Sequence, residues 1–303
     1  MDEEPRVLVL GPGGAKGFLE LGALLYLEQH RYLEKVSTII GVSVGAVIGL
    51  LLVCGYSAEE ILENCFQTTL FQDLSSVKLS EVSNHSGLIP NTVIREKLES
   101  LVQNRFGIIP SLHQLYMATG LMLEVVTVNL NTSNTVYLSH KTDPECGCVE
   151  AVLLSMNIPL LFYKLEYKGN LYIDGAFGNP YPIDRYDDGK TRILGIHIST
   201  REKIEGNMDL LIYIHKIIDA PSSQITKMMI NKCSKMCTHI RLSNKILDTT
   251  GVSLSLDDKV KMIVRGYNKT RKQLTKVEGV YVSKPGEQED IPYDSPEHES
   301  SLI

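Results

Sequence analysis

Two glycine-rich turns near the amino terminus carry the residues best suited to nucleophilic chemistry. Residues 11–17 (Gly-Pro-Gly-Gly-Ala-Lys-Gly) follow one short apolar run, and residues 41–45 (Gly-Val-Ser-Val-Gly) end the next. A Gly-x-Ser-x-Gly turn between a strand and a helix holds its serine in a strained conformation that exposes the hydroxyl. Ser43 is therefore the candidate nucleophile of an acyl-transfer reaction.

The earlier turn supplies hydrogen-bond donors for the same reaction. When a serine attacks an ester, negative charge develops on the carbonyl oxygen, and backbone N–H groups stabilise it. Gly13 and Gly14 can turn successive N–H groups towards one point, with Ala15 next in the chain, whereas Pro12 has no N–H. We predict an oxyanion hole at Gly13, Gly14 and Ala15, with Lys16 as a substrate-binding residue.

The base that takes the serine proton has two candidate identities. A Ser-His-Asp enzyme of the α/β-hydrolase type should not carry its serine as early as the second strand, although histidines do follow Ser43. Asp174 ends an expected strand, precedes Gly175 and Ala176, and lies in an apolar context that would raise its proton affinity. Chain order favours a dyad of Ser43 and Asp174, and a histidine-containing triad remains the alternative.

Nucleotide sites explain the first turn less well. A dinucleotide fingerprint needs the third glycine of Gly-x-Gly-x-x-Gly and an acidic ribose ligand after the second strand, and the chain lacks both. A P-loop fails because Lys16 lies between Ala15 and Gly17. Each motif alone is weak evidence, but their order along the chain favours a hydrolase.

Alternating strands and helices must position these turns. Residues 7–10 and 36–40 are expected strands, and helices are expected from Phe18 and from Val44 to about Cys54. The charge-free stretch 36–58 divides into a strand, a turn and a buried helix, which argues against a membrane span. The pattern predicts a mixed α/β fold with further helices at 57–66, about 91–106, 149–156, 208–218, 224–237 and 255–274, a loop at 72–87, and further strands at 121–129, 135–139, 163–167, 171–173, 193–198 and 239–242.

Composition indicates one globular domain and an acidic tail. The chain has 303 residues, 43% hydrophobic content and a formal charge of -6. Residues 285–303 hold six acidic residues and no Lys or Arg, so the remainder is neutral and lacks the basic footprint of nucleic-acid binding. We expect a catalytic domain at residues 1–283 and a disordered tail at 284–303, whose last residues would suit a peptide-binding partner.

The amino terminus and the cysteines indicate a cytoplasmic protein. Residues 1–6 are acidic, and the apolar run after them is too short for a signal peptide. The six cysteines lack the spacing of a disulfide framework, so we expect reduced thiols. Cys233, Cys237 and His239 could be metal ligands, but their context favours buried packing. We expect no metal and no cofactor.

The ordered motifs resemble the patatin-like phospholipase family. That family has a glycine-rich loop with a basic residue, then Gly-x-Ser-x-Gly after the next strand, then Asp-Gly-Ala or Asp-Gly-Gly. Residues 155–162 resemble its serine and proline loop, and residues 254–266 its closing helix, so the resemblance covers about residues 5–275. Pro12 and Asn157 depart from the usual pattern. The matching motif residues are Gly11, Gly17, Gly41, Gly45, Gly175 and Ala176.

The resemblance implies a three-layer α/β/α fold, with a mostly parallel central sheet between helices. It also implies a catalytic dyad of Ser43 and Asp174, an oxyanion hole in the glycine loop, and calcium-independent hydrolysis of a lipid acyl ester, that of a phospholipid at a membrane surface. Apolar segments at 208–218 and 224–237, with lysines nearby, could contact a bilayer. The alternative is a lipid-binding or partner-binding protein that uses the tail for recruitment.

Overall fold

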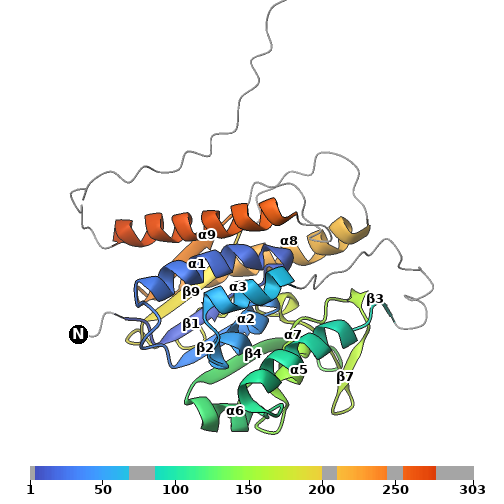
Figure 1. Cartoon of the computed structure of the whole chain (residues 1–303). Coiled ribbons are helices and arrows are strands. Elements are labelled where there is room, and N and C mark those ends of the chain that lie inside the picture. Colours follow the sequence, from blue (N-terminus) through green and yellow to red (C-terminus); the bar gives the residue numbers. More distant parts are fainter. Residues whose placement is uncertain (1–3, 68–85, 200–209, 244–254, 278–303) are drawn as a thin grey trace, which may run out of the picture.

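A central sheet of eight strands organises the protein (Figure 1). The computed structural model describes residues 4–67, 86–199, 210–243 and 255–277. The strand order is β10-β9-β1-β2-β4-β8-β7, and β5 also pairs with β4. The parallel strands are β1 (Val7–Leu10), β2 (Thr38–Val42), β4 (Met122–Asn129), β9 (Ile193–Ile198) and β10 (Cys237–Leu242); β5 (Asn134–Leu138), β7 (Leu165–Tyr167) and β8 (Asn170–Asp174) pair antiparallel.

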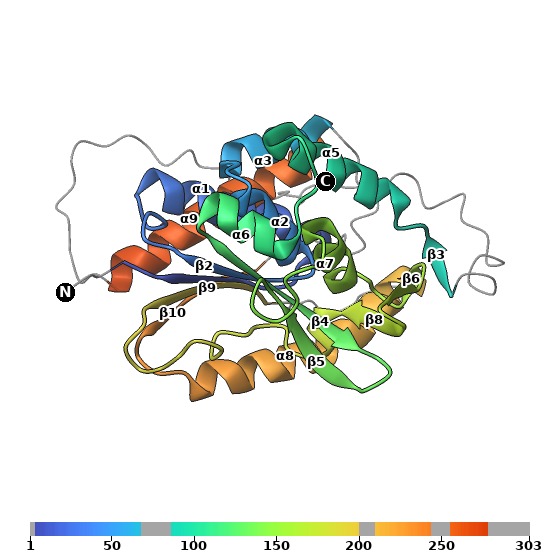
Figure 2. The same cartoon turned by 90° about the horizontal axis from the view of Figure 1, so that it is seen from below.

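Helices cover both faces of this sheet, which confirms the predicted three-layer α/β/α fold. Figure 2 shows α8 (Leu210–Lys232) on one face, with α1 (Gly17–Gln29), α2 (Val44–Val53) and α9 (Leu256–Val277) on the other. The remaining described elements are the 3-10 turns η1 (Gly14–Lys16) and η3 (Gly175–Phe177) and the helices α3 (Ala58–Gln67), α5 (Thr92–Phe106), α6 (Leu112–Thr119) and α7 (Cys148–Ser155).

Side-chain alternation along the strands divides the core in two. On β1, Leu8 and Leu10 belong to the cluster that includes α1 and α2, whereas Val7 and Val9 face the cluster that includes Ile218 of α8. Successive side chains of a strand point to opposite faces, so a continuous apolar strand must be covered on both. The short apolar runs of the sequence are therefore central strands.

Helix α9 packs directly against α1, the helix that follows the glycine loop. A Cβ on Gly22 would lie 2.1 Å from the carbonyl oxygen of Ile263, and one on Gly266 would lie 2.0 Å from that of Leu19. Backbones this close leave no room for a side chain at either glycine. The expected helix at 255–274 is confirmed. By packing on α1, it supports the helix that follows the glycine loop.

Two local predictions need correction, and two features of the fold were missed. The expected helices at 208–218 and 224–237 form one helix, α8, with Pro221 inside it. The chain leaves the helix after Lys232, so Cys237 begins β10 instead of sharing a helix face with Cys233. Helix α6 and a small parallel sheet of β3 (Gly87–Ile89) and β6 (Leu160–Phe162) were not predicted. The capping box of Ser111 and Gln114 was the available signal for α6.

Some predictions concern residues outside the described part of the chain. These are the tail at 284–303, the domain end at 283 and most of the expected loop at 72–87. Among the described residues, none of the helices combines the length and the hydropathy that crossing a membrane requires.

Candidate active site

Ser43 and Asp174 meet across strand β4. Ser43 follows β2 directly, and Val42 of β2 is paired with Val126 of β4. Asp174 ends β8, where it is paired with Thr127, the next residue of β4. Residues 131 positions apart in the chain thus flank one point of the sheet, and the Oγ of Ser43 donates a hydrogen bond of 2.6 Å to the Oδ2 of Asp174.

The turn at Ser43 has the geometry expected of a strained nucleophile. Its φ of 56° and ψ of -123° lie in a region that favours glycine, so the backbone conformation is costly for a serine. The turn fits because a Cβ on Gly41 would lie 2.4 Å from the Cα of Ala46, and one on Gly45 would lie 2.4 Å from the carbonyl oxygen of Leu10. Ser43 also begins α2, whose positive end favours negative charge at this point.

Asp174 is a buried carboxylate with two specific donors. It is 1% exposed, and its Oδ1 accepts a hydrogen bond of 2.8 Å from the N–H of Ala176. Burial raises the pKa of Asp174 to about 6, against the lowering effect of the hydrogen bonds from Ser43 and Ala176. Such a carboxyl is mostly ionised at neutral pH and has more proton affinity than an ordinary aspartate, as a general base requires.

No histidine hydrogen-bonds to Ser43 or Asp174 within the part of the chain that the structure describes. His197 and His239 line the same cavity, but the Nδ1 of His239 lies 3.1 Å from the hydroxyl of Tyr181. The geometry around Asp174 therefore favours direct proton transfer over the triad alternative.

Ser155 fixes the backbone of Ser43, a role that the sequence did not reveal. Its Oγ accepts a hydrogen bond of 2.9 Å from the N–H of Ser43 and donates one of 2.6 Å to the carbonyl oxygen of Val126. Both partners are buried, so the hydroxyl satisfies a donor and an acceptor that water does not reach. Ser155 lay in the serine and proline loop of the resemblance, which was the available signal.

We expect Ser155→Ala to lower kcat by about ten- to hundredfold with little change in KM, because the N–H of Ser43 loses its acceptor and the nucleophile shifts. The free energy of unfolding should fall by about 1 to 3 kcal/mol. Ser139→Ala is the matched control: Ser139 is 1% exposed, its Oγ lies 3.2 Å from that of Thr142, and among the described residues it forms no hydrogen bond with Ser43, Ser155 or Val126. It should lose stability but keep kcat; an unchanged kcat in Ser155→Ala would contradict the positioning role.

The glycine loop presents unpartnered donors beside the turn at Ser43. Among the described residues, the N–H groups of Gly13, Gly14 and Ala15 donate no hydrogen bond, whereas that of Gly11 is bonded to Ile196 across the sheet. A Cβ on Gly17 would lie 2.9 Å from Val44, the residue after Ser43, so the loop packs against the turn. The three predicted oxyanion donors are thus available for a ligand.

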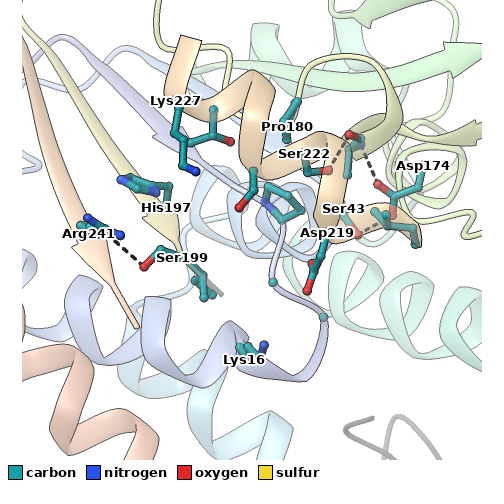
Figure 3. Close-up of a pocket in the computed structure, with 18 of the residues that line it drawn as sticks. Lys16, Ser43, Asp174, Pro180, His197, Ser199, Asp219, Ser222, Lys227 and Arg241 are labelled. Carbon is teal, nitrogen blue, oxygen red and sulfur yellow. Dashed lines mark hydrogen bonds between the residues drawn. The ribbon is translucent and has the colours of Figure 1, made fainter. Parts of the chain in front are cut away.

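A cavity of about 580 Å³ joins the glycine loop to the two candidate catalytic residues (Figure 3). Gly13, Gly14 and Lys16 line it together with Ser43 and Asp174. Lys16, the predicted substrate-binding residue, ends η1 and is 7% exposed. The cavity therefore brings together the predicted catalytic residues and Lys16 with two of the three predicted oxyanion donors; Ala15 is not among its lining residues. Of the other motif residues only Ala176 lines it.

The other wall of the cavity was not predicted. Helix α8 contributes much of it, and the hydroxyl of Ser222 on α8 donates a hydrogen bond of 2.9 Å to the carbonyl oxygen of Ala176. That bond fastens the helix beside Asp174. Further lining residues, spread over β9, β10 and α8 without a recognisable motif, are His197, Ser199, Lys227, Asn231, His239 and Arg241.

The possible metal ligands group differently from the set considered in the sequence. Cys233 and Cys237 lie with Asp187, their ligand atoms all within 4.8 Å of one another, and His239 is not part of this group. Asp187 already accepts hydrogen bonds from the N–H (2.6 Å) and the hydroxyl (2.5 Å) of Ser234. Asp187 therefore binds the chain just after the end of α8. The absence of a bound metal remains a prediction.

The sequence of this chain matches a family model and several curated proteins. The family model of the patatin-like phospholipases matches residues 8–186. A probable lipid hydrolase of Invertebrate iridescent virus 6 is 30% identical over 182 residues, 59% of this chain and 62% of that protein. The human omega-hydroxyceramide transacylase is 26% identical over 193 residues, 62% of this chain and 34% of the relative. The chain thus spans less than two thirds of either relative.

Solved structures share the fold at low identity. VipD from Legionella pneumophila has a TM-score of 0.54 and 17% identity, covering 90% of this chain and 67% of its own. The complex of ExoU with SpcU from Pseudomonas aeruginosa has a TM-score of 0.51 and 16% identity. The match covers 90% of this chain and 52% of the matched chain. The family match takes in the glycine loop, the serine turn and Asp174, and it shows that this chain belongs to the patatin-like phospholipase family.

Proposed function

We propose that the chain hydrolyses carboxylic esters of lipids, with Ser43 as the nucleophile and Asp174 as the general base. The hydrogen bond of 2.6 Å between the two side chains is the observation that carries this proposal. The family and the name of the viral relative support lipid ester hydrolysis as the activity. The roles of the two residues are our inference from their geometry and chemistry.

The reaction would proceed through an acyl-enzyme. The Oγ of Ser43 bonds to the ester carbon while its proton passes to Asp174, and the carbonyl oxygen takes up the electron pair. N–H groups of Gly13, Gly14 and Ala15 would stabilise this oxyanion, each worth about 3 to 4 kcal/mol in comparable enzymes. Collapse expels the alcohol, which takes the proton from Asp174. Water then attacks the acyl group, with Asp174 again accepting a proton and Ser43 regaining it.

The residues around Ser43 support a mechanism that needs no calcium ion. Asp174 and Asp219 are the carboxylates among the lining residues that the structure describes. Calcium takes six to eight oxygen ligands, several of them carboxylates. Asp174 is committed to Ser43 and Ala176, which leaves one carboxylate for such an ion.

The surface of α8 supports work at a lipid interface. Tyr213, Ile217 and Met228 of this helix are about half exposed although they are large and apolar. The same helix lines the cavity through Ile218 and Ile230, so an acyl chain could pass from a membrane surface into the site. Recruitment of a protein partner by the acidic tail is a second possibility, and it concerns residues outside the described structure.

The test is acyl release from vesicles of defined phospholipid composition, with and without a calcium chelator. We expect release of free fatty acid at the same rate in both conditions. A fluorophosphonate probe should label the protein at Ser43, as located by mass spectrometry. Loss of activity with the chelator would contradict the calcium-independent mechanism, and labelling at another serine would contradict the assignment of the nucleophile.

A further inference from the structure

The cavity has a second end that the dyad mechanism does not use. Figure 3 shows Ser43 and Asp174 on one side of the cavity and His197, Ser199 and Arg241 on the other. We call this second group, together with Lys227, the cationic end. Apolar side chains that include Ile198, Ile218 and Ile230 line the cavity as well.

Sheet topology brings the cationic end together. β9 and β10 are parallel, and Arg241 of β10 is paired in register with His197 of β9. Ser199 follows β9 directly, and its Oγ accepts a hydrogen bond of 3.1 Å from the Nε of Arg241. These residues therefore lie towards the carboxyl ends of the strands, the edge at which Ser43 follows β2 and where open α/β sheets bind ligands.

The charge of the cationic end is not neutralised by the described residues. Lys227 and Arg241 are exposed at the mouth of the cavity and form no ion pair among the described residues, and the bond from Arg241 to Ser199 leaves most of its guanidinium donors to solvent or a ligand. Asp219 lines the cavity too, but it precedes Lys227 by eight residues, about 12 Å along the axis of α8. Ser222 fastens that earlier part of α8 beside Ala176, towards the Ser43 end.

His197 adds a buried polar group without a partner. It is 6% exposed, its ring packs against Tyr181 at 4.9 Å, and its Nδ1 has no hydrogen-bond partner in the described structure. Burial and the nearby charges of His239 and Arg241 lower the pKa of His197 to about 4. An anion beside Arg241 would offset those charges and raise the pKa of this histidine.

We infer that the cationic end binds the phosphate of a glycerophospholipid whose acyl ester lies at Ser43. An arginine fork, a lysine ammonium and a serine hydroxyl are donors suited to phosphate oxygens, and the apolar walls between the two ends suit the rest of the lipid. The inference rests on the proposed function in one respect, because placing the acyl ester at Ser43 assumes that Ser43 is the nucleophile. It makes Lys227 and Arg241 binding residues that select phospholipid over neutral lipid.

The test uses a pair of ether lipids that differ only in phosphate: 1-O-decylglycerol 3-phosphate and 1-O-decylglycerol. Neither contains an ester, so both can be titrated calorimetrically against the wild-type chain without turnover. We expect the phosphate-bearing lipid to bind at least about tenfold more tightly. Lys227→Gln and Arg241→Gln should each weaken its binding by about tenfold and leave the neutral lipid unchanged. Lys232→Gln, an exposed lysine later on α8 that does not line the cavity, is the matched control.

Two further measurements identify the source of any effect. Arg241→Lys should recover part of the affinity, and binding of the phosphate lipid should raise the pKa of His197 in an NMR titration. If inorganic phosphate alone binds as tightly as the lipid, the site serves free phosphate and the inference is overturned. Equal affinities for the two ether lipids would overturn it as well. Because no step depends on hydrolysis, failure of the Ser43 mechanism would leave this result intact.

Discussion

Ser43→Ala should lose about 10⁴-fold or more in kcat while it still binds lipid. The substitution removes the atom that bonds to the ester carbon. The Oγ of Ser43 lies 2.6 Å from the Oδ2 of Asp174, and no other hydroxyl among the described residues hydrogen-bonds to this carboxylate. Acyl release from phospholipid vesicles measures the loss, and affinity for a non-hydrolysable ether lipid measures the binding that should persist. Full activity in this variant would exclude Ser43 as the nucleophile.

Ser43→Gly separates chemistry from strain at the same position. Both variants lack the hydroxyl, but glycine adopts a φ of 56° at little cost whereas alanine does not. We expect Ser43→Gly to be as inactive as Ser43→Ala and to be more stable by about 1 kcal/mol in chemical denaturation. Equal stability of the two variants would mean that the turn at Ser43 stores no strain.

The positions of Ser43 and Asp174 at strand ends were predictable from sequence because each has its own local signal. Ser43 lies between two glycines at the end of an apolar run, and Asp174 ends another strand before Gly175. Turns of this kind are determined by residues adjacent in the chain, so a single sequence carries them. The contact of the two side chains was not visible, because it depends on the pairing of β2 and β8 with the same strand, β4.

The parts that the sequence did not reveal depend on long-range packing. Ser155 reaches Ser43 across 112 positions, and the cationic end collects residues from β9, β10 and α8 with no common spacing. Two helices were predicted in place of α8 because the apolar patterns at residues 208–218 and 224–237 are separate, and Pro221 lies between them. The helix continues past it, and packing of the buried Ile218 and Ser222 around this point offsets the cost of the proline.

Stability and activity should oppose each other at Asp174. Its pKa is raised in the folded state from 3.8 to about 6, so the folded chain binds more protons than the unfolded chain between these values. The associated stability is present below the unfolded pKa and is lost as pH rises through about 6, a loss of about 3 kcal/mol. Asp174→Asn cannot ionise, so in denaturation at pH 8 it should be more stable than the wild type, with the difference vanishing near pH 4.

The same titration should govern catalysis with the opposite sign. The base must be ionised to take the proton of Ser43, so kcat/KM should rise with pH, reach half its maximum near the pKa of about 6 and stay level above it. Asp174→Asn should lower activity by about a thousandfold or more and abolish this acid limb. A wild-type profile with no inflection near pH 6, or an unchanged limb in Asp174→Asn, would assign the base to another group. If the prediction holds, the burial that makes Asp174 costly to ionise is the same burial that makes it basic enough to activate Ser43.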